Sequence, residues 1–418
     1  MTEAHGEGRF SRRALLLGAA GAVAGGGLLA PACGSTGEAA DASPAGPARF
    51  VDFHGPHQPG ITGESTAWTA AAAFTVVGSG RALLRDTLRE LSDEIDGLMG
   101  GRPITVRDPS YPPDDSGLLG TEPAPDDLSI VLSVGSSLFD DRFGLAGRAP
   151  RELTRLRPMI NDVLDQARCH GDLLLTVQAR NIDTVVFALR QLMRRTRATL
   201  TLRWVIDGFN RAGRPGHRST GSPRNLLGFV DGTANLDVAD RRVMDDVIWV
   251  GSSSGEPEWA TGGSYHVLRV IRMFVERWDR VSLTEQERMF GRRKADGAPL
   301  DGRHETDVPD YAADPTGAIT PLNSHIRLAN PRTPATEKNR ILRRGFSYTR
   351  GWDAAGNLDQ GLAFACYQSS LNDGFLAVQP RLAGEPLEGY IRAEGGGLFF
   401  APPGGAAAGG FLGETLLA

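Results

Sequence analysis

The strongest constraint on the fold is an order of predicted strands and helices that occurs twice along the 418-residue chain. In the first half, a β-prone run ends at residues 74–77, and five aliphatic residues between positions 84 and 98 then share one face of a helix. Further strands are predicted at 128–134, 172–178 and 199–206. Further helices are predicted at 153–167 and in a segment that ends at Arg195. Apart from the helix at 153–167, this order is typical of a ferredoxin-like domain.

The second half repeats the order around a long insertion. Strands are predicted at 265–275, 346–348, 361–368 and 397–400, and helices at 283–290 and 375–382. The insertion at 291–345 is rich in Pro, Asp and Arg, and ordered loops of that length are usually functional. We therefore predict an α+β fold of two ferredoxin-like domains, each an antiparallel sheet with helices, at residues 49–222 and 223–418.

The N-terminus predicts export. Ser11, Arg12 and Arg13 begin a twin-arginine pattern, and a weakly apolar Gly/Ala/Leu stretch follows at 18–29. This stretch is too short for a convincing membrane span, so cleavage after residues 30–32 is favoured over anchoring. Cys33 follows directly, which keeps a lipid anchor open as the alternative. Residues 1–48 are thus predicted to be a Tat signal and flexible linker of a periplasmic, extracellular or envelope-associated protein.

Composition excludes some classes of function. The formal net charge is −5, which gives no broad basic surface for nucleic acid. Beyond Cys33 the cysteines are Cys169 and Cys366, too few and too far apart for a metal cluster. His54 and His57 have a spacing that could bind metal on a helix, but the neighbouring prolines favour a structural loop.

One carboxylate is placed unusually at the centre of the chain. Asp231 lies in NLLGFVDGTANL (225–236), within an apolar run flanked by Gly228 and Gly232. Such a carboxylate should be partly desolvated, and desolvation raises the pKa of an acid, which suits proton transfer. The alternative is an Asp that caps its own turn.

A histidine and an arginine in the insertion offer complementary chemistry. His325 lies in NSHIRLANP (323–331), and Arg343 follows eighteen positions later. A neutral imidazole can ligate haem iron, and arginines suit the propionates of a haem. A hydrogen-bonded core histidine is the alternative for His325.

These motifs together resemble those of the dye-decolourising (DyP-type) peroxidases, in particular their Tat-exported branch. The resemblance rests on GxxDG at 228–232, on SHIRLANP at 324–331 and on RRGF at 343–346, in that order. It extends over most of the chain, from about His54 to Leu416. It implies one haem b per chain, held mainly by the second domain.

The resemblance also implies roles for individual residues. His325 would be the proximal iron ligand, and Asp231 and Arg343 the distal pair that cleaves hydrogen peroxide to form an oxyferryl haem, which then oxidises organic or dye donors. Glu388 matches the position of the acid that hydrogen-bonds the proximal histidine, although an exposed Glu is its alternative. Further haem contacts are implied at Gly232, Thr233, Ala234, Arg292, Asn330, Pro331, Arg332 and Arg343.

Three questions stay open at this stage. Arg292 could instead belong to a solvated basic turn, and Trp352 and Tyr348 are candidates for passing electrons to donors too large for a buried pocket. The rival functions are a haem-handling deferrochelatase, with an iron-uptake permease as partner, and a relative that has lost its chemistry. The oligomeric state, including a homo-oligomer, is left open.

Overall fold

The computed structural model describes residues 47–103, 108–210, 223–405 and 409–418. The predicted twin-arginine signal and Cys33 lie outside the described residues. The described residues belong to one structural unit. Within the described part, no helix has both the length and the apolar character needed to cross a membrane.

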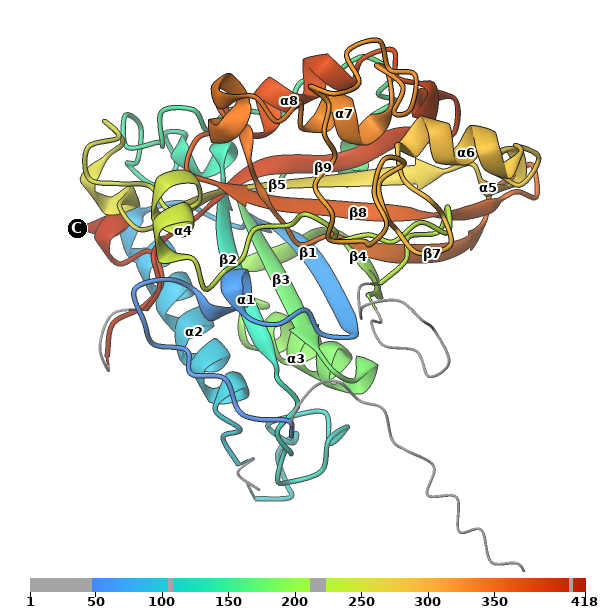
Figure 1. Cartoon of the computed structure of the whole chain (residues 1–418). Helices are drawn as coiled ribbons and strands as arrows, with labels where there is room; N and C mark the ends of the chain where they lie inside the picture. The colour runs from blue at the N-terminus through green and yellow to red at the C-terminus, as the bar shows by residue number, and fades with distance from the viewer. Residues whose placement is uncertain (1–46, 104–107, 211–222, 406–408) are drawn as a thin grey trace, which may run out of the picture. The chain divides into compact units, whose positions relative to one another are not determined.

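The first half forms a four-stranded antiparallel sheet with two long helices (Figure 1). The strands lie side by side in the order β2-β3-β1-β4, as in a ferredoxin-like domain. After the short α1 (Pro59–Thr62), the elements are β1 (Trp68–Val76), α2 (Arg81–Met99), β2 (Ser129–Gly135), β3 (Leu173–Ala179), α3 (Ile182–Arg195) and β4 (Leu200–Phe209). Apart from the helix at 153–167, the predicted order is confirmed.

The helix predicted at residues 153–167 is wrong. This segment is an extended strap that ends in a 3-10 turn at Gln166–Arg168. Pro158 disfavours helix in the residue before it, and Asn161 has a positive φ of 66°. The strap is instead bonded to the second half, with Val163 N donating to Ala393 O at 3.0 Å. The buried aliphatic residues of this segment, whose spacing suggested one face of a helix, instead belong to an extended segment that packs against the core.

The second half repeats the architecture, with strands in the order β9-β5-β8-β7. A short α4 (Arg241–Val247) precedes it. The elements are β5 (Ser264–Met273), α5 (Val275–Trp278), α6 (Leu283–Phe290), α7 (His325–Ala329), β6 (Leu342–Arg343), β7 (Phe346–Trp352), β8 (Leu358–Gln368), α8 (Phe375–Leu382) and β9 (Ile391–Ala401). The α+β fold of two ferredoxin-like domains is therefore confirmed. The 291–345 insertion carries α7 and β6.

The two sheets close into one ring. Strand β2 pairs with β9 at one junction, and β4 pairs with β7 at the other through Phe209 and Ser347. The second junction is tight, because a Cβ on Gly208 would lie 2.0 Å from Ser347 O. Glycine is therefore required where the halves meet.

Alternation along the strands separates two environments. In β1, Ala71 and Ala73 face a cluster inside the ring, whereas Ala70 and Ala72 join the core formed with α2 and α3. In β5, Leu268 and Val270 belong to the inner cluster, whereas Arg269, Ile271 and Met273 line the cavity on the outer face. In the first half this outer face is packed by helices, but in the second half it borders a cavity.

Candidate active site

A cavity of about 670 Å³ lies on the outer face of the second sheet. Its walls come from β5, β7, β8 and β9, from α7 and α8, and from the loop at 223–236. Figure 1 shows α7 and α8 on one side of β9, β5 and β8. Among the described residues, six of the lining residues come from the first half: Ser65, Met159, Ile160, Asn161, Asp162 and Asn210. The volume lies within the roughly 300–1,000 Å³ of small-molecule and cofactor sites.

The cavity brings together most of the site residues predicted from the sequence. Pro331 is not among the residues that line it. Those that do line it are Asp231, Gly232, Thr233, Ala234, Arg292, His325, Asn330, Arg332, Arg343 and Glu388.

His325 begins α7 and is held by a buried carboxylate. Its Nδ1 lies 2.8 Å from Glu385 Oε2, and the Glu385 side chain is only 3% exposed. Since the carboxylate accepts, Nδ1 donates, and Nε2 is left as the nitrogen that can bind a metal. Burial lowers the pKa of His325, but the charge and hydrogen bond of Glu385 outweigh it, so the net pKa is raised. The core-histidine alternative is not supported, because the ring lines the cavity.

The prediction that Glu388 is the acid paired with His325 is wrong, since Glu385 occupies that place. Glu385 is extended, with ψ of 151°, and directly precedes the 3-10 turn Pro386–Gly389, so turn periodicity does not give the direction of its side chain. Glu388 lies within that turn and also lines the cavity, and its backbone O accepts from Asn161 Nδ2 at 3.0 Å. The one signal for Glu385 in the sequence is an acid directly before Pro386.

Asp231 and Arg343 form a pair at the cavity wall. Asp231 Oδ1 lies 3.6 Å from Arg343 Nη1, and the side chains are 29% and 34% exposed. Arg343 Nη2 also donates to Thr233 O at 2.7 Å. Partial desolvation of Asp231 is thus confirmed. Within the described residues its carboxylate makes no hydrogen bond to a backbone N–H, so the turn-capping alternative is not supported.

The loop that carries Asp231 needs unusual backbone angles. Gly228 and Gly232 have φ of 86° and 111°, and Ala234 has φ of 58° although it is not glycine. Asp231 N donates to Pro223 O at 2.8 Å, which anchors the start of the loop. The sharp turn expected from the glycines is therefore present.

Two further arginines are suited to an anionic ligand. Arg292 is 6% exposed, and its Nη1 donates to Gly297 O and Glu305 O at 2.7 and 3.0 Å, so the solvated-turn alternative is wrong. Burial lowers the pKa of Arg292. Arg332 Nε is buried and has no hydrogen-bond partner among the described residues. An anionic group bound in the cavity would satisfy such a donor.

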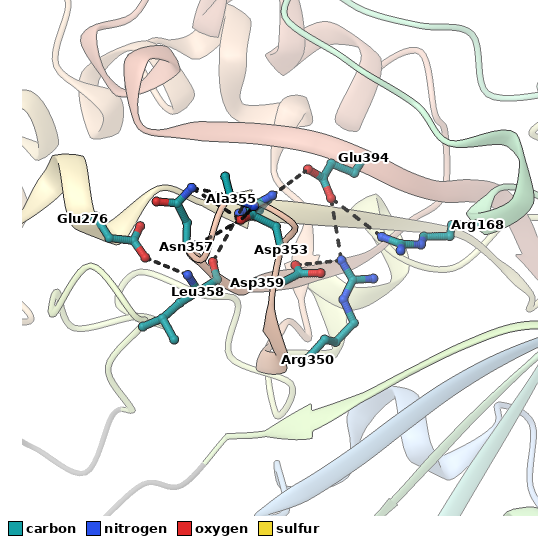
Figure 2. A network of polar contacts seen from close by, with 10 residues as sticks. Arg168, Glu276, Arg350, Asp353, Ala355, Asn357, Leu358, Asp359 and Glu394 are labelled. Carbon is teal, nitrogen blue, oxygen red and sulfur yellow. Dashed lines mark hydrogen bonds and ion pairs between the residues drawn. The ribbon is translucent and has the colours of Figure 1, made fainter. Parts of the chain in front are cut away.

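The two aromatic candidates for electron transfer differ in exposure. Tyr348 is fully buried, so its prediction as a surface exit is wrong. Trp352 is 77% exposed at the end of β7. Figure 2 shows the polar network that fixes this hairpin, in which Arg350 reaches Asp359 at 3.0 Å and Glu394 at 3.6 Å. Trp352 thus lies beside a well-anchored turn.

The fold and the site define a class of protein. The fold has two ferredoxin-like domains, and the cavity on the second sheet holds a carboxylate-oriented histidine, an acid–arginine pair and buried arginines. Imidazole is a ligand for iron, and the arginines match an anionic cofactor. These features are those of a cofactor-dependent oxidoreductase.

Comparison with family models identifies the family. Residues 58–210 match the model of the Dyp-type peroxidase N-terminal domain, and residues 222–406 match that of the C-terminal domain. The chain belongs to the Dyp-type peroxidase family. It is a haem-dependent peroxidase that acts on hydrogen peroxide and organic donors. The domain limits predicted at 49–222 and 223–418 stay a prediction.

Individual relatives agree with this assignment. The chain is 44% identical over 415 residues to a deferrochelatase of Yersinia pestis bv. Antiqua, covering 97% of this chain and 95% of the relative. It is 48% identical over 368 residues to the deferrochelatase of Escherichia coli K12, covering 87% and 86%. The solved structure of ferric DtpA from Streptomyces lividans is 36% identical with a TM-score of 0.80, covering 88% of this chain and 97% of that one.

Proposed function

We propose that the protein is an exported peroxidase in which His325 ligates the haem iron and Asp231 with Arg343 processes hydrogen peroxide. The observation that carries this proposal is that one cavity holds both the His325–Glu385 pair and the Asp231–Arg343 pair. The residues around the cavity fit a haem. His325 Nε2 is available as a ligand, and the unpartnered Arg332 Nε suits a propionate.

The other predicted contacts that line the cavity fit the same arrangement. Arg292 would add positive charge near the propionates, and the backbone at 232–234 would contact the macrocycle. When bound, the haem supplies the redox chemistry of peroxide reduction and donor oxidation. Because most lining residues lie beyond position 222, the second domain would hold most of the cofactor.

Asp231 and Arg343 would divide the handling of peroxide. The Asp231 carboxylate can take the proton from one peroxide oxygen and return it to the other, directly or through a water. Arg343 stays cationic and can stabilise negative charge on the departing oxygen as the O–O bond breaks. Glu385 keeps the His325 ring oriented throughout.

Turnover of two donors tests the proposed function. The haem-loaded protein should oxidise a small phenolic donor and an anthraquinone dye only when peroxide is present. We propose that the dye, too large for the cavity, is oxidised at exposed Trp352. Trp352→Phe should therefore lower dye turnover and leave phenol turnover unchanged. If neither donor is oxidised in a peroxide-dependent way, the proposed peroxidase function is overturned. If the Trp352→Phe variant turns over the dye as fast as the unchanged protein, Trp352 is excluded as the site of dye oxidation.

A deferrochelatase is the second candidate function. It is favoured by the curated relatives of that name, at 44% and 48% identity. In this reading, the same cavity would release iron from haem and an iron-uptake permease would be a partner. Free iron and porphyrin measured after incubation without donor would support this reading. A homo-oligomer is also proposed, to be tested by light scattering.

The two glutamates near His325 provide a matched pair of variants. Glu385→Gln should weaken haem binding or turnover by roughly 10- to 100-fold, because it removes the charge that orients the ring and raises its basicity. Glu388→Gln changes the same chemical group three residues away and should have a much smaller effect. Haem titration followed by absorption measures both. Equal effects of the two variants would argue against the assignment of Glu385.

Export is tested at the twin-arginine pattern. Replacing Arg12 and Arg13 together by lysine should trap the precursor in the cytoplasm, because the pattern is read by the Tat receptor and not through its charge alone. Cell fractionation with immunoblotting measures the distribution. Normal export of the double variant would refute Tat targeting.

Labelling with a radioactive fatty acid, with Cys33→Ala as control, decides whether Cys33 carries a lipid.

A further inference from the structure

Arg343 lies on a strand whose outer edge is completed by a side chain. Strand β6 is only two residues long, and it pairs with β8 beyond the end of the β7–β8 pairing, on the edge opposite β5. Its inner edge pairs with β8, where Arg343 is opposite Cys366. The outer edge would leave the backbone N–H and C=O of Arg343 without a strand partner. Buried or half-buried backbone groups of this kind need another partner.

The carboxamide of Asn235 supplies both missing bonds. Asn235 Oδ1 accepts from Arg343 N at 2.9 Å, and Asn235 Nδ2 donates to Arg343 O at 2.9 Å. A primary amide offers one acceptor and a donor side by side, so it can mimic the paired N–H and C=O of a neighbouring strand. Asn235 therefore takes the place of a neighbouring strand at this one residue.

The same loop also holds the far end of the arginine. Thr233 O accepts from Arg343 Nη2 at 2.7 Å, and Asp231 Oδ1 lies 3.6 Å from Nη1. Loop residues 231–235 thus fix Arg343 at its backbone and at its guanidinium. Asp231 belongs to the same loop as Asn235. The two hydrogen bonds of the Asn235 side chain therefore tie the backbone of Arg343 to the loop that carries Asp231.

We propose that Asn235 is a positioning residue that sets the spacing of Asp231 and Arg343. This inference rests on the proposed role of that pair in peroxide cleavage. Asn235 does not act on peroxide itself, because its amide is used by the backbone of Arg343. Its loss lets β6 and the loop move apart, which changes the geometry at which the carboxylate and guanidinium meet the peroxide.

Hydrogen exchange in the haem-free protein tests the contact without using activity. The amide of Arg343 should exchange at least about fivefold faster in Asn235→Ala than in the unchanged protein, the ratio that corresponds to a hydrogen bond of ~1 kcal/mol. Asn235→Asp keeps the acceptor for Arg343 N and should preserve protection of this amide, while it loses the donor to Arg343 O. Mass spectrometry with fragmentation around residue 343 measures both.

Kinetics of the haem-loaded protein tests the consequence. Misplacement of a catalytic group by about 1 Å can cost on the order of 10²-fold, so the second-order reaction with peroxide should slow strongly in Asn235→Ala. The KM for the phenolic donor should stay unchanged, and Asn235→Asp should recover part of the rate. Asn181→Ala is the control, since it removes an amide bonded to Asp126, far along the chain and outside the cavity lining.

The outcomes separate the inference from the proposed function. Faster exchange together with a slower peroxide reaction supports the positioning role. Unchanged peroxide kinetics in Asn235→Ala, with Arg343→Ala still slow, would overturn the inference and leave the proposed function intact. If Arg343→Ala and Asp231→Asn both react with peroxide at the full rate, the proposed role of that pair is overturned, and the inference about Asn235 falls with it. If Asn235→Ala does not fold, unaltered Arg343 exchange and peroxide rate in Asn235→Ser, which cannot make both bonds, would overturn the inference.

Discussion

Replacing His325 by alanine is expected to abolish the ferric haem absorption of the purified protein and, with it, peroxide-dependent turnover. His325 is the imidazole in the cavity whose Nδ1 is occupied by Glu385, so its Nε2 has the orientation for iron. Without it, the cavity keeps its arginines and apolar walls but loses the proposed iron ligand. Absorption spectra recorded during haem titration measure the loss.

His304→Ala is the matched control for this variant. His304 lies in the same insertion but is exposed and is not among the residues that line the cavity. It should bind haem as the unchanged protein does. A His325→Ala protein with an unaltered haem spectrum and full activity would remove His325 as the ligand.

Asp231→Asn and Arg343→Ala are expected to slow the reaction with peroxide by large factors. Loss of a positioned general acid–base costs roughly 10²- to 10⁴-fold, and loss of one charge-stabilising donor costs roughly 10²- to 10³-fold. Stopped-flow mixing with peroxide, followed by the change in haem absorption, measures each rate. Asp237→Asn, in the same loop but exposed, should react at the normal rate.

The double variant shows whether the two residues act together. Since the two side chains lie 3.6 Å apart, their effects should not add. A normal rate in Asp231→Asn combined with a slow Arg343→Ala would make Arg343 the main catalyst. Arg343→Lys keeps the charge but loses the planar donor geometry, so it separates charge from hydrogen bonding.

Much of the fold could be predicted because its strands and helices have clear local periods. The face shared by Leu84, Leu88 and Leu91 is buried in α2, and α8 spans the predicted residues. The strap at 153–167 is predicted to be a helix because its apolar spacing is compatible with both states. Its actual partners, such as Ala393, are more than 200 positions away and leave no local signal.

The site could be predicted in part for a similar reason. Asp231, His325 and Arg343 lie in short motifs that stand out in the sequence, and the structure brings all three to one cavity. Glu385 and Asn235 were missed because their roles depend on side-chain direction and on the backbone they meet. An asparagine that completes the edge of a two-residue strand is recognisable only when the strand is placed.

Closure of the two sheets into one ring has a consequence for biosynthesis. Strands β2 and β4 form the edges of the first sheet, and their partners β9 and β7 are made later by the ribosome. Until those strands emerge, the nascent first half presents two unprotected edges, which are templates for aggregation. A chain that stops between the halves would keep both edges exposed. Docking of β9, the last strand made, is thus the event that closes the ring and covers the last exposed edge of the first sheet.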